Sequence, residues 1–544
     1  MRSTMQCQNP LTLVWGSLFI VLLLSGCSDG DNNNDSDAIP AIEKPQAANP
    51  TVQGPISGGG GAECCVINFG ALAVDLRTQG YVPGTPFYAG VNFDEAEVGY
   101  LETEYFISGT AMSYIPTDEL RSDGVWPVEG ADAAEFTSRI VVLRPMNDAD
   151  FNGTVVVEWF NVSGGVDAAP DLTQMQTELM REGYAWVGVS AQRAGVEGGG
   201  AFDLPLKVID AERYASLNHP GDSFSYDIFS QAAQSVRNPV GMDPLGGLSV
   251  ERMIAVGQSQ SAFRLVTYVN AIHPTIELFD GFIIHSRGNG SSALSQIPQV
   301  EVATPDPVFI REDLPELVLT LQAETDIFRL NSVTQRQPDT ETLRLWEVAG
   351  AAHSDVYTTI KGPVDRGDDP TVADVISNND ARPPFITCPL PVNDGPGHWV
   401  AKAAIAAVDG WIRTGDPAPS APLLTLNAQR TGFEYDNLGN VLGGVRTPYV
   451  DAPVALLSGE GQPPANAAFC GLFGTTVLFD EAMLAELYPD KAAYVEAIDR
   501  ATDAAVAARF IRPADAELIK ARARTSPIGS VAGAGWQSNV QPMK

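Results

Sequence analysis

Ten consecutive residues near the middle of the chain decide the fold: Arg252-Met253-Ile254-Ala255-Val256-Gly257-Gln258-Ser259-Gln260-Ser261. The first five are an apolar run typical of a buried β-strand, and residues 262–269 have the apolar spacing of a helix. A serine on such a strand-to-helix turn is strained, so the residues two before and two after it must be small. Gly257 and Ser261 meet this requirement, which makes Ser259 a candidate nucleophile.

The short pattern alone does not single out Ser259, because it recurs elsewhere. Gly221-Asp222-Ser223-Phe224-Ser225 fits equally well, but His219-Pro220 stands before it where a strand is required. Gly188-Val189-Ser190-Ala191-Gln192 follows a predicted strand, yet the bulky Gln192 takes the second small position. Gly26-Cys27-Ser28-Asp29-Gly30 lies in a polar N-terminal segment. Only Ser259 has a strand before it and a helix after it, so this context carries the assignment.

Strand and helix patterns alternate on both sides of the turn, which predicts an α/β fold with a mostly parallel central sheet flanked by helices. Strands are predicted at 103–108, 139–143, 153–160, 184–189, 252–256, 282–285, 317–321 and 343–348. Helices are predicted at 172–181, 226–236, 262–269 and 399–413. The catalytic domain is expected at 62–416, and residues 417–544 are expected to be a loop-rich and helical extension of the same domain.

A serine nucleophile needs a base, and the chain has only five histidines. His353 follows the predicted strand 343–348 across a loop of small residues, at the end of a strand where α/β sites assemble. His285 ends a predicted strand and is the runner-up, as well as a candidate pocket lining. His219, His273 and His398 lie beside prolines or at the start of a helix. We therefore expect His353 to be the base.

The group that orients the base should follow strand 317–321, which runs into Gln322-Ala323-Glu324-Thr325-Asp326. Asp326 is preferred because the chain usually turns through a small residue, here Ala323, before it presents the acid. Glu324 remains an alternative acid. The order Ser259, Asp326, His353 is that of α/β-hydrolases and differs from the orders in chymotrypsin-like and subtilisin-like enzymes.

Two backbone amides are expected to stabilise the oxyanion that forms when an ester is attacked. One is that of Gln260, directly after the nucleophile. The other should come from the loop Asn161-Val162-Ser163-Gly164-Gly165, where glycines allow close approach, and Val162 is the best placed residue. Such chemistry requires no cofactor and no metal.

The N-terminus predicts export. Arg2 precedes the apolar stretch 11–24, which is too short to span a bilayer comfortably and ends in Leu24-Ser25-Gly26-Cys27. This resembles a bacterial lipoprotein signal, which implies cleavage after residue 26 and a lipid anchor on Cys27. By the same resemblance, Ser28 favours the outer membrane; an ordinary signal peptide is the alternative. Residues 27–61 are rich in Asp, Asn, Ser, Pro and Gly and predict a disordered tether.

The composition limits the kinds of molecule and metal that the chain is expected to bind. A formal net charge of -34 argues against binding to nucleic acid. In an oxidising compartment Cys388 and Cys470 look like one disulfide, and Cys64 and Cys65 could form another, although the pairing stays open. None of these cysteines has metal-ligand spacing to other Cys or His residues, so a structural role is favoured.

Four segments resemble a bacterial family of secreted or lipoprotein α/β-hydrolase-domain esterases: 153–159, 223–231, 257–262 and 439–446. The resemblance runs from about Tyr105 to Ile528. It implies the α/β-hydrolase fold, a serine nucleophile in a Gly-x-Ser-x-Ser turn, and action on a carboxylic ester. It does not imply a particular ester, so the substrate could be a small molecule or a polymer.

We therefore expect an exported serine hydrolase that cleaves a carboxylic ester through an acyl-enzyme on Ser259. An acyltransferase or lactonase with the same triad, and a catalytically inactive surface-binding lipoprotein, remain alternatives. A lid is expected among residues 195–217, residues 288–314 or the C-terminal extension.

Overall fold

The computed structural model describes residues 47–61, 64–69, 72–79, 81–200, 203–378, 380, 388–463 and 468–530. The expected signal peptide, Cys27 and the first part of the tether lie outside the described residues. The described residues belong to one compact unit. Among the described residues, no helix is long and apolar enough to cross a membrane.

A nine-stranded sheet runs through this unit in the order β1-β4-β5-β7-β6-β8-β9-β10-β11. Neighbouring strands from β7 to β11 are parallel, whereas β1, β4 and β5 are antiparallel to their neighbours. The strands are β1 Thr51–Gln53, β4 Tyr100–Pro116, β5 Val128–Pro145, β6 Thr154–Trp159, β7 Ala185–Val189, β8 Arg252–Gln258, β9 Gly281–His285, β10 Leu317–Ala323 and β11 Leu343–Val348. The predicted α/β class and mostly parallel sheet are confirmed.

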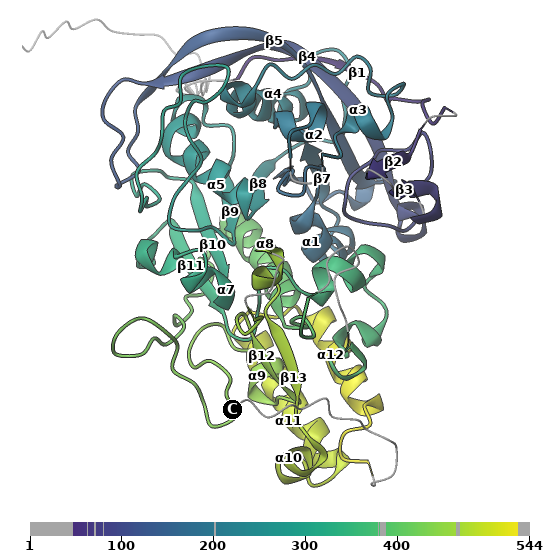
Figure 1. The fold of residues 1–544 in the computed structure, drawn as a ribbon, viewed down its shortest axis with the longest axis vertical. Coiled ribbons are helices and arrows are strands. Elements are labelled where there is room, and N and C mark those ends of the chain that lie inside the picture. The colour runs from purple at the N-terminus through teal and green to yellow at the C-terminus, as the bar shows by residue number, and fades with distance from the viewer. Residues whose placement is uncertain are drawn as a thin grey trace, which may run out of the picture. The chain divides into compact units, whose positions relative to one another are not determined.

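Helices cover both faces of the sheet. Helices α1 (Pro170–Arg181) and α8 (Gly397–Thr414) pack on one face, and α4 (Ser225–Arg237) and α5 (Gln260–Thr267) pack on the other (Figure 1). Side chains alternate along each strand, so Val155 and Val157 of β6 face α4 and α5, while Val156 faces α1 and α8. Burial on both faces explains why these strands are continuous apolar runs.

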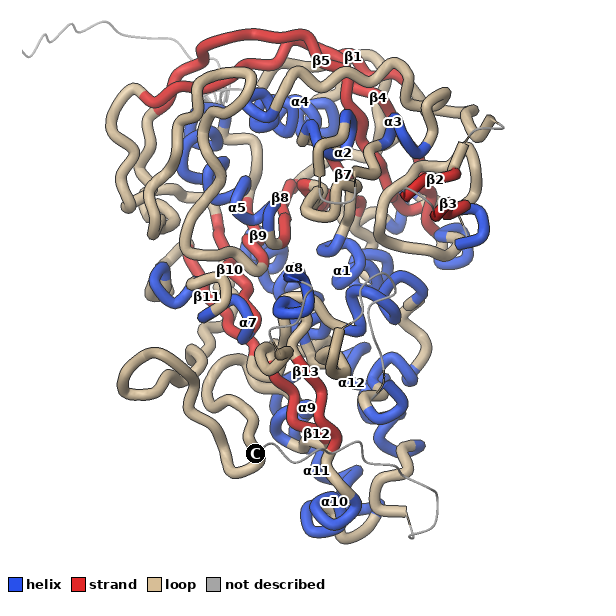
Figure 2. The backbone as a smooth tube through the Cα atoms, viewed as in Figure 1, coloured by secondary structure: helices blue, strands red, loops and turns tan. Residues whose placement is uncertain are grey.

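Two antiparallel features differ from the prediction. Strands β4 and β5 form a hairpin much longer than the predicted 103–108 and 139–143, seen as the red band across the top of Figure 2. Strand β1 lies inside the predicted tether 27–61, where Val52 is buried and pairs with Ile107 of β4. The expectation of disorder up to residue 61 is wrong for this strand, because one buried valine and the free edge of β4 order it.

The C-terminal segment packs on the core. It contains the hairpin of β12 (Ala455–Ser458) and β13 (Thr475–Leu478) and the helices α9 (Pro448–Asp451), α10 (Glu481–Leu487), α11 (Lys491–Ala507) and α12 (Pro513–Thr525). Phe510 lies edge-on to Trp346 of β11, with ring centroids 5.0 Å apart.

Short elements and two disulfides complete the described chain. The other strands and α-helices are β2 (Val66–Phe69), β3 (Leu72–Asp75), α2 (Arg193–Glu197), α3 (Leu206–Ile209), α6 (His273–Ile276) and α7 (Glu324–Phe328), and short 3-10 and π-helical turns connect several elements. Cys64 is bonded to Cys65, and Cys388 is bonded to Cys470. These are the two pairings that the sequence suggested.

Candidate active site

Ser259 lies on the sharp turn between β8 and α5. Its backbone has φ 60° and ψ -118°, a conformation that residues other than glycine rarely adopt. A Cβ atom at Gly257 would lie 3.0 Å from the Cβ atom of Ser261, a tight contact that favours glycine there. The N–H of Ser259 donates to the carbonyl of His285 across 2.9 Å, which ties the turn to the end of β9.

Ser259, Asp326 and His353 follow the ends of three parallel strands, β8, β10 and β11, which bring the three side chains together. Ser259 Oγ is 2.9 Å from His353 Nε2, and His353 Nδ1 is 2.6 Å from Asp326 Oδ1. Asp326 is fully buried, and its second oxygen accepts the N–H of Ala323 at 2.7 Å. With Nδ1 donating to the carboxylate, Nε2 is left to accept the proton of the serine hydroxyl.

Glu324, the alternative acid, lies in another set of contacts. Its two carboxylate oxygens accept the N–H groups of Gly350 at 2.6 Å and Gly459 at 2.8 Å. Burial raises the pKa of Glu324 to about 8. Glu324 therefore joins the His353 loop to the C-terminal segment, and Asp326 alone of the two acids reaches His353.

Two hydrogen bonds fix the backbone of His353. The N–H of His353 donates to Thr325 Oγ1 at 3.1 Å, and the carbonyl of His353 accepts from Gln258 Nε2 at 2.8 Å. Thr325 and Gln258 are directly adjacent to Glu324 and Ser259 in the chain, yet no sequence motif pointed to their roles.

The other histidines make separate contacts. His285 pairs with Asp171 of α1, with His285 Nδ1 2.7 Å from Asp171 Oδ1. His219 lies 2.9 Å from the carbonyl of Ala191, and His273 lies 3.3 Å from Glu316. His398 stacks on Tyr357 with ring centroids 3.6 Å apart, and burial lowers its pKa. Of these four, only His285 touches the elbow, through its backbone.

The two residues predicted to stabilise the oxyanion, Gln260 and Val162, are in contact with each other. Gln260 is the first residue of α5, where an N–H group has no carbonyl of its own helix to bond. The N–H of Val162 points at the side-chain oxygen of Gln260, 3.5 Å away. Asn161 Nδ2 donates to the carbonyl of Gln258 at 3.0 Å, which fixes the loop beside the elbow. The positions of these amides are compatible with an oxyanion site.

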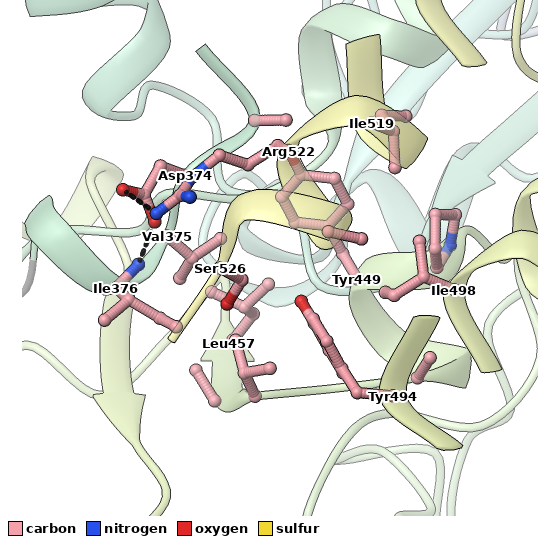
Figure 3. A pocket seen from close by; sticks show the side chains of 16 residues that line it. Asp374, Val375, Ile376, Tyr449, Leu457, Tyr494, Ile498, Ile519, Arg522 and Ser526 are labelled. Carbon is pink, nitrogen blue, oxygen red and sulfur yellow. Dashed lines mark hydrogen bonds and ion pairs between the residues drawn. The ribbon is translucent and has the colours of Figure 1, made fainter. Parts of the chain in front are cut away.

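A separate cavity lies between residues 373–376 and the C-terminal segment (Figure 3). Leu457, Tyr494 and Ile498 line it, and Arg522 pairs with Asp374 at one side. Its volume is about 40 Å³, enough for a few waters at ~10–15 Å³ each. None of the three triad residues lines it, so it is not the substrate site. In the part of the chain that the structure describes, no group of three His, Cys, Asp or Glu residues could hold a metal ion.

Three hydrolases are among the solved structures that match part of this chain. A putative dienelactone hydrolase from Klebsiella pneumoniae subsp. pneumoniae is 14% identical, and the match covers 44% of this chain and 85% of that chain with a TM-score of 0.23. XC6422 from Xanthomonas campestris, an α/β serine hydrolase without a lid, is 14% identical, and the match covers 39% of this chain and 78% of that chain with a TM-score of 0.23. A glucuronoyl esterase from Solibacter usitatus is 11% identical, and the match covers 45% of this chain and 76% of that chain with a TM-score of 0.23.

The family comparison covers far more of the chain. No curated protein matches the sequence. The family described as alpha/beta hydrolase domain matches residues 52–521, from β1 into α12. This span includes the nine-stranded sheet except Thr51, the elbow at Ser259 and both partners of its hydrogen-bond chain. The chain therefore belongs to the alpha/beta hydrolase domain family.

Proposed function

We propose that this chain is a serine hydrolase that cleaves a carboxylic ester through an acyl-enzyme on Ser259. The observation that carries the proposal is the continuous hydrogen-bond chain from Ser259 Oγ through His353 to Asp326, on a strained turn at the ends of parallel strands. In a nucleophile–base–acid arrangement of this kind, the base removes the serine proton and the acid holds the base in the required tautomer.

In the first half of the reaction, Ser259 Oγ attacks the ester carbonyl carbon while His353 Nε2 takes the hydroxyl proton. The N–H groups of Gln260 and Val162 stabilise the negative oxygen of the tetrahedral intermediate. When the bond to the alcohol oxygen breaks, His353 returns the proton to that oxygen and the alcohol leaves. Asp326 stays ionised and stabilises the imidazolium that forms between these steps.

In the second half, water replaces the alcohol. His353 takes a proton from the water as its oxygen attacks the acyl carbon, and then returns the proton to Ser259 Oγ as the acid is released. A sugar or another alcohol in the place of water would make the same triad an acyltransferase.

We also propose that the enzyme is exported and anchored through Cys27 to the outer membrane. The support is the apolar stretch 11–24 with its terminal cysteine. Two disulfides in one chain are in keeping with an oxidising compartment.

The test compares Ser259→Ala with Ser261→Ala, a serine two residues away in the same motif, on a short-chain p-nitrophenyl ester. Ser261 is fully buried, and its hydroxyl has no hydrogen-bond partner among the described residues, so it is a matched control. Ser259→Ala should lose about 10⁴- to 10⁶-fold in kcat, whereas Ser261→Ala should keep most of it. Equal loss in both variants, or turnover that survives Ser259→Ala, would contradict the proposal.

A further inference from the structure

We propose that the side chain of Gln260 is a specificity-determining residue that favours acyl groups with a hydrogen-bond donor on the carbon next to the ester carbonyl. This inference rests on the proposed ester hydrolysis at Ser259. The chemical class it names is esters of α-hydroxy acids, and of α-amino acids whose nitrogen keeps an N–H.

Gln260 places its side-chain oxygen at one of the two expected oxyanion donors. The N–H of Val162 points at Gln260 Oε1 across 3.5 Å. This distance is at the long end of hydrogen bonding, so the contact is weak and a substrate can replace it at little cost. Gln260 is partly exposed, so a bound substrate can reach its side chain.

The orientation of the Gln260 amide is set by Gln192. Gln260 Nε2 donates to Gln192 Oε1 at 2.8 Å, and Trp159 Nε1 donates to the same oxygen at 3.0 Å. An indole N–H can only donate, so the atom of Gln192 facing it must be the oxygen. Gln260 therefore presents its nitrogen to Gln192 and its oxygen to Val162.

A charged pair holds the other end of Gln192. Asp222 takes a hydrogen bond from the side chain of Gln192, accepts the N–H of Arg193 at 2.7 Å, and lies 3.1 Å from Arg264. Burial acts to raise the pKa of Asp222, but Arg264 and the hydrogen-bond donors outweigh it and keep the pKa below its usual value. Because an ionised carboxylate only accepts, Gln192 cannot turn its amide around without losing contacts at both ends.

Because Gln260 Oε1 is a hydrogen-bond acceptor with a fixed direction beside the oxyanion site, acyl groups with and without a donor interact with it differently. A plain alkyl acyl group brings its developing negative oxygen to Val162 and leaves Gln260 Oε1 without a donor. An acyl group with a hydroxyl or N–H on the adjacent carbon can donate to Gln260 Oε1. This new hydrogen bond replaces the one that Gln260 Oε1 loses when the N–H of Val162 turns to the oxyanion. Sites that offer a hydrogen bond to a substrate discriminate in this way against analogues that lack the group.

The experiment uses two esters that differ only in the hydroxyl, ethyl L-lactate and ethyl propionate. The ratio of their kcat/KM values is measured for the full chain and for Gln260→Leu, which removes the acceptor at similar size. The ratio should fall about three- to tenfold in Gln260→Leu, the range for one hydrogen bond between neutral groups. Because the same two esters are used with both enzymes, the inherent difference in reactivity between the lactate and propionate esters cancels when the two ratios are compared.

Two further variants separate orientation from a general structural effect. Gln192→Leu leaves Gln260 in place but frees its amide, so the ratio should also fall. Gln53→Leu, an exposed glutamine on β1, should leave it unchanged. An unchanged ratio in either Gln260→Leu or Gln192→Leu overturns the inference while the proposed function stands. Turnover of these esters that persists in Ser259→Ala would overturn the proposed function instead.

Discussion

His353 Nδ1 lies 2.6 Å from Asp326 Oδ1, although the sequence also offers Glu324 two residues earlier. The difference lies in α7, the short helix that begins directly after β10. Asp326 folds back so that its second oxygen accepts the N–H of Ala323, and this bond aims the first oxygen at the histidine. Glu324 at the first position of the helix points toward Gly350 and Gly459 instead.

Replacement of Asp326 by Asn should abolish most activity and leave the fold intact. An amide cannot stabilise the imidazolium and can favour the wrong tautomer of His353, so kcat should fall about 10³- to 10⁴-fold. Steady-state kinetics measure the loss, and circular dichroism checks the fold.

Glu324→Gln is the matched control. One oxygen that now accepts a backbone N–H would become an NH₂ group facing that donor, which costs about 1–3 kcal/mol of stability. We expect a lower melting temperature and a kcat within about tenfold of the original, since no catalytic bond is lost. A larger kcat loss in Glu324→Gln than in Asp326→Asn would reverse the assignment of the acid.

The disulfide between Cys388 and Cys470 supports the histidine loop. Backbone bonds join Ser354 to Leu472 and Val356 to Asn393, on either side of the disulfide-linked segments. The cysteines also pack with Val356. Loss of this bridge should let His353 shift relative to Ser259, and shifts of about 1 Å cost on the order of 10²-fold in rate.

The double variant Cys388→Ser/Cys470→Ser should therefore lose about 10- to 100-fold in kcat, with a smaller change in KM. The matched control is Cys64→Ser/Cys65→Ser, which removes a bridge between adjacent residues and away from the loop. Comparable kcat for the two double variants would show that the Cys388–Cys470 bridge does not hold the histidine.

Asp355 should make the protein less stable as pH rises. Burial raises the pKa of Asp355 to about 6, with repulsion from Asp394 adding to it, whereas the unfolded chain has a pKa of about 3.9. Between these values the folded state holds a proton that the unfolded state has lost, so stability falls as pH rises from about 4 to 6 and stays lower above that.

Asp355→Asn removes this titration and keeps an oxygen for the N–H and hydroxyl of Thr358. Relative to the original chain it should gain up to about 3 kcal/mol of unfolding free energy at pH 8 and almost nothing at pH 4. Denaturant unfolding at both pH values measures the two differences. A gain of equal size at both would mean that proton binding is not its cause.

Much of the fold is readable from the sequence because β6 to β11 are buried on both faces and so appear as apolar runs. The extent of the β4–β5 hairpin is not, since its outer part, around Asp132 and Ala133, is exposed and carries no apolar pattern. Strand β1 has a single buried side chain, Val52, which no pattern of alternation can reveal.

The candidate site shows the same division. Strand context and chain order led to Ser259 and His353, which the structure places 2.9 Å apart. The sequence could not exclude Glu324 as the acid, because one of the groups that holds its carboxylate, the N–H of Gly459, is 135 residues away in the chain. Contacts such as those of Gln192 with Gln260 join segments 68 residues apart, and only the folded chain displays them.

The most direct test of Ser259 as the nucleophile is to identify the residue that a fluorophosphonate labels. Such probes react with an activated serine and form a stable adduct, which peptide mass spectrometry can locate. We expect one adduct, located on Ser259 itself by fragmentation of the peptide that also contains Ser261, and no adduct in Ser259→Ala or after unfolding. An adduct on another serine, such as Ser223 or Ser261, or labelling that persists in Ser259→Ala, would contradict it.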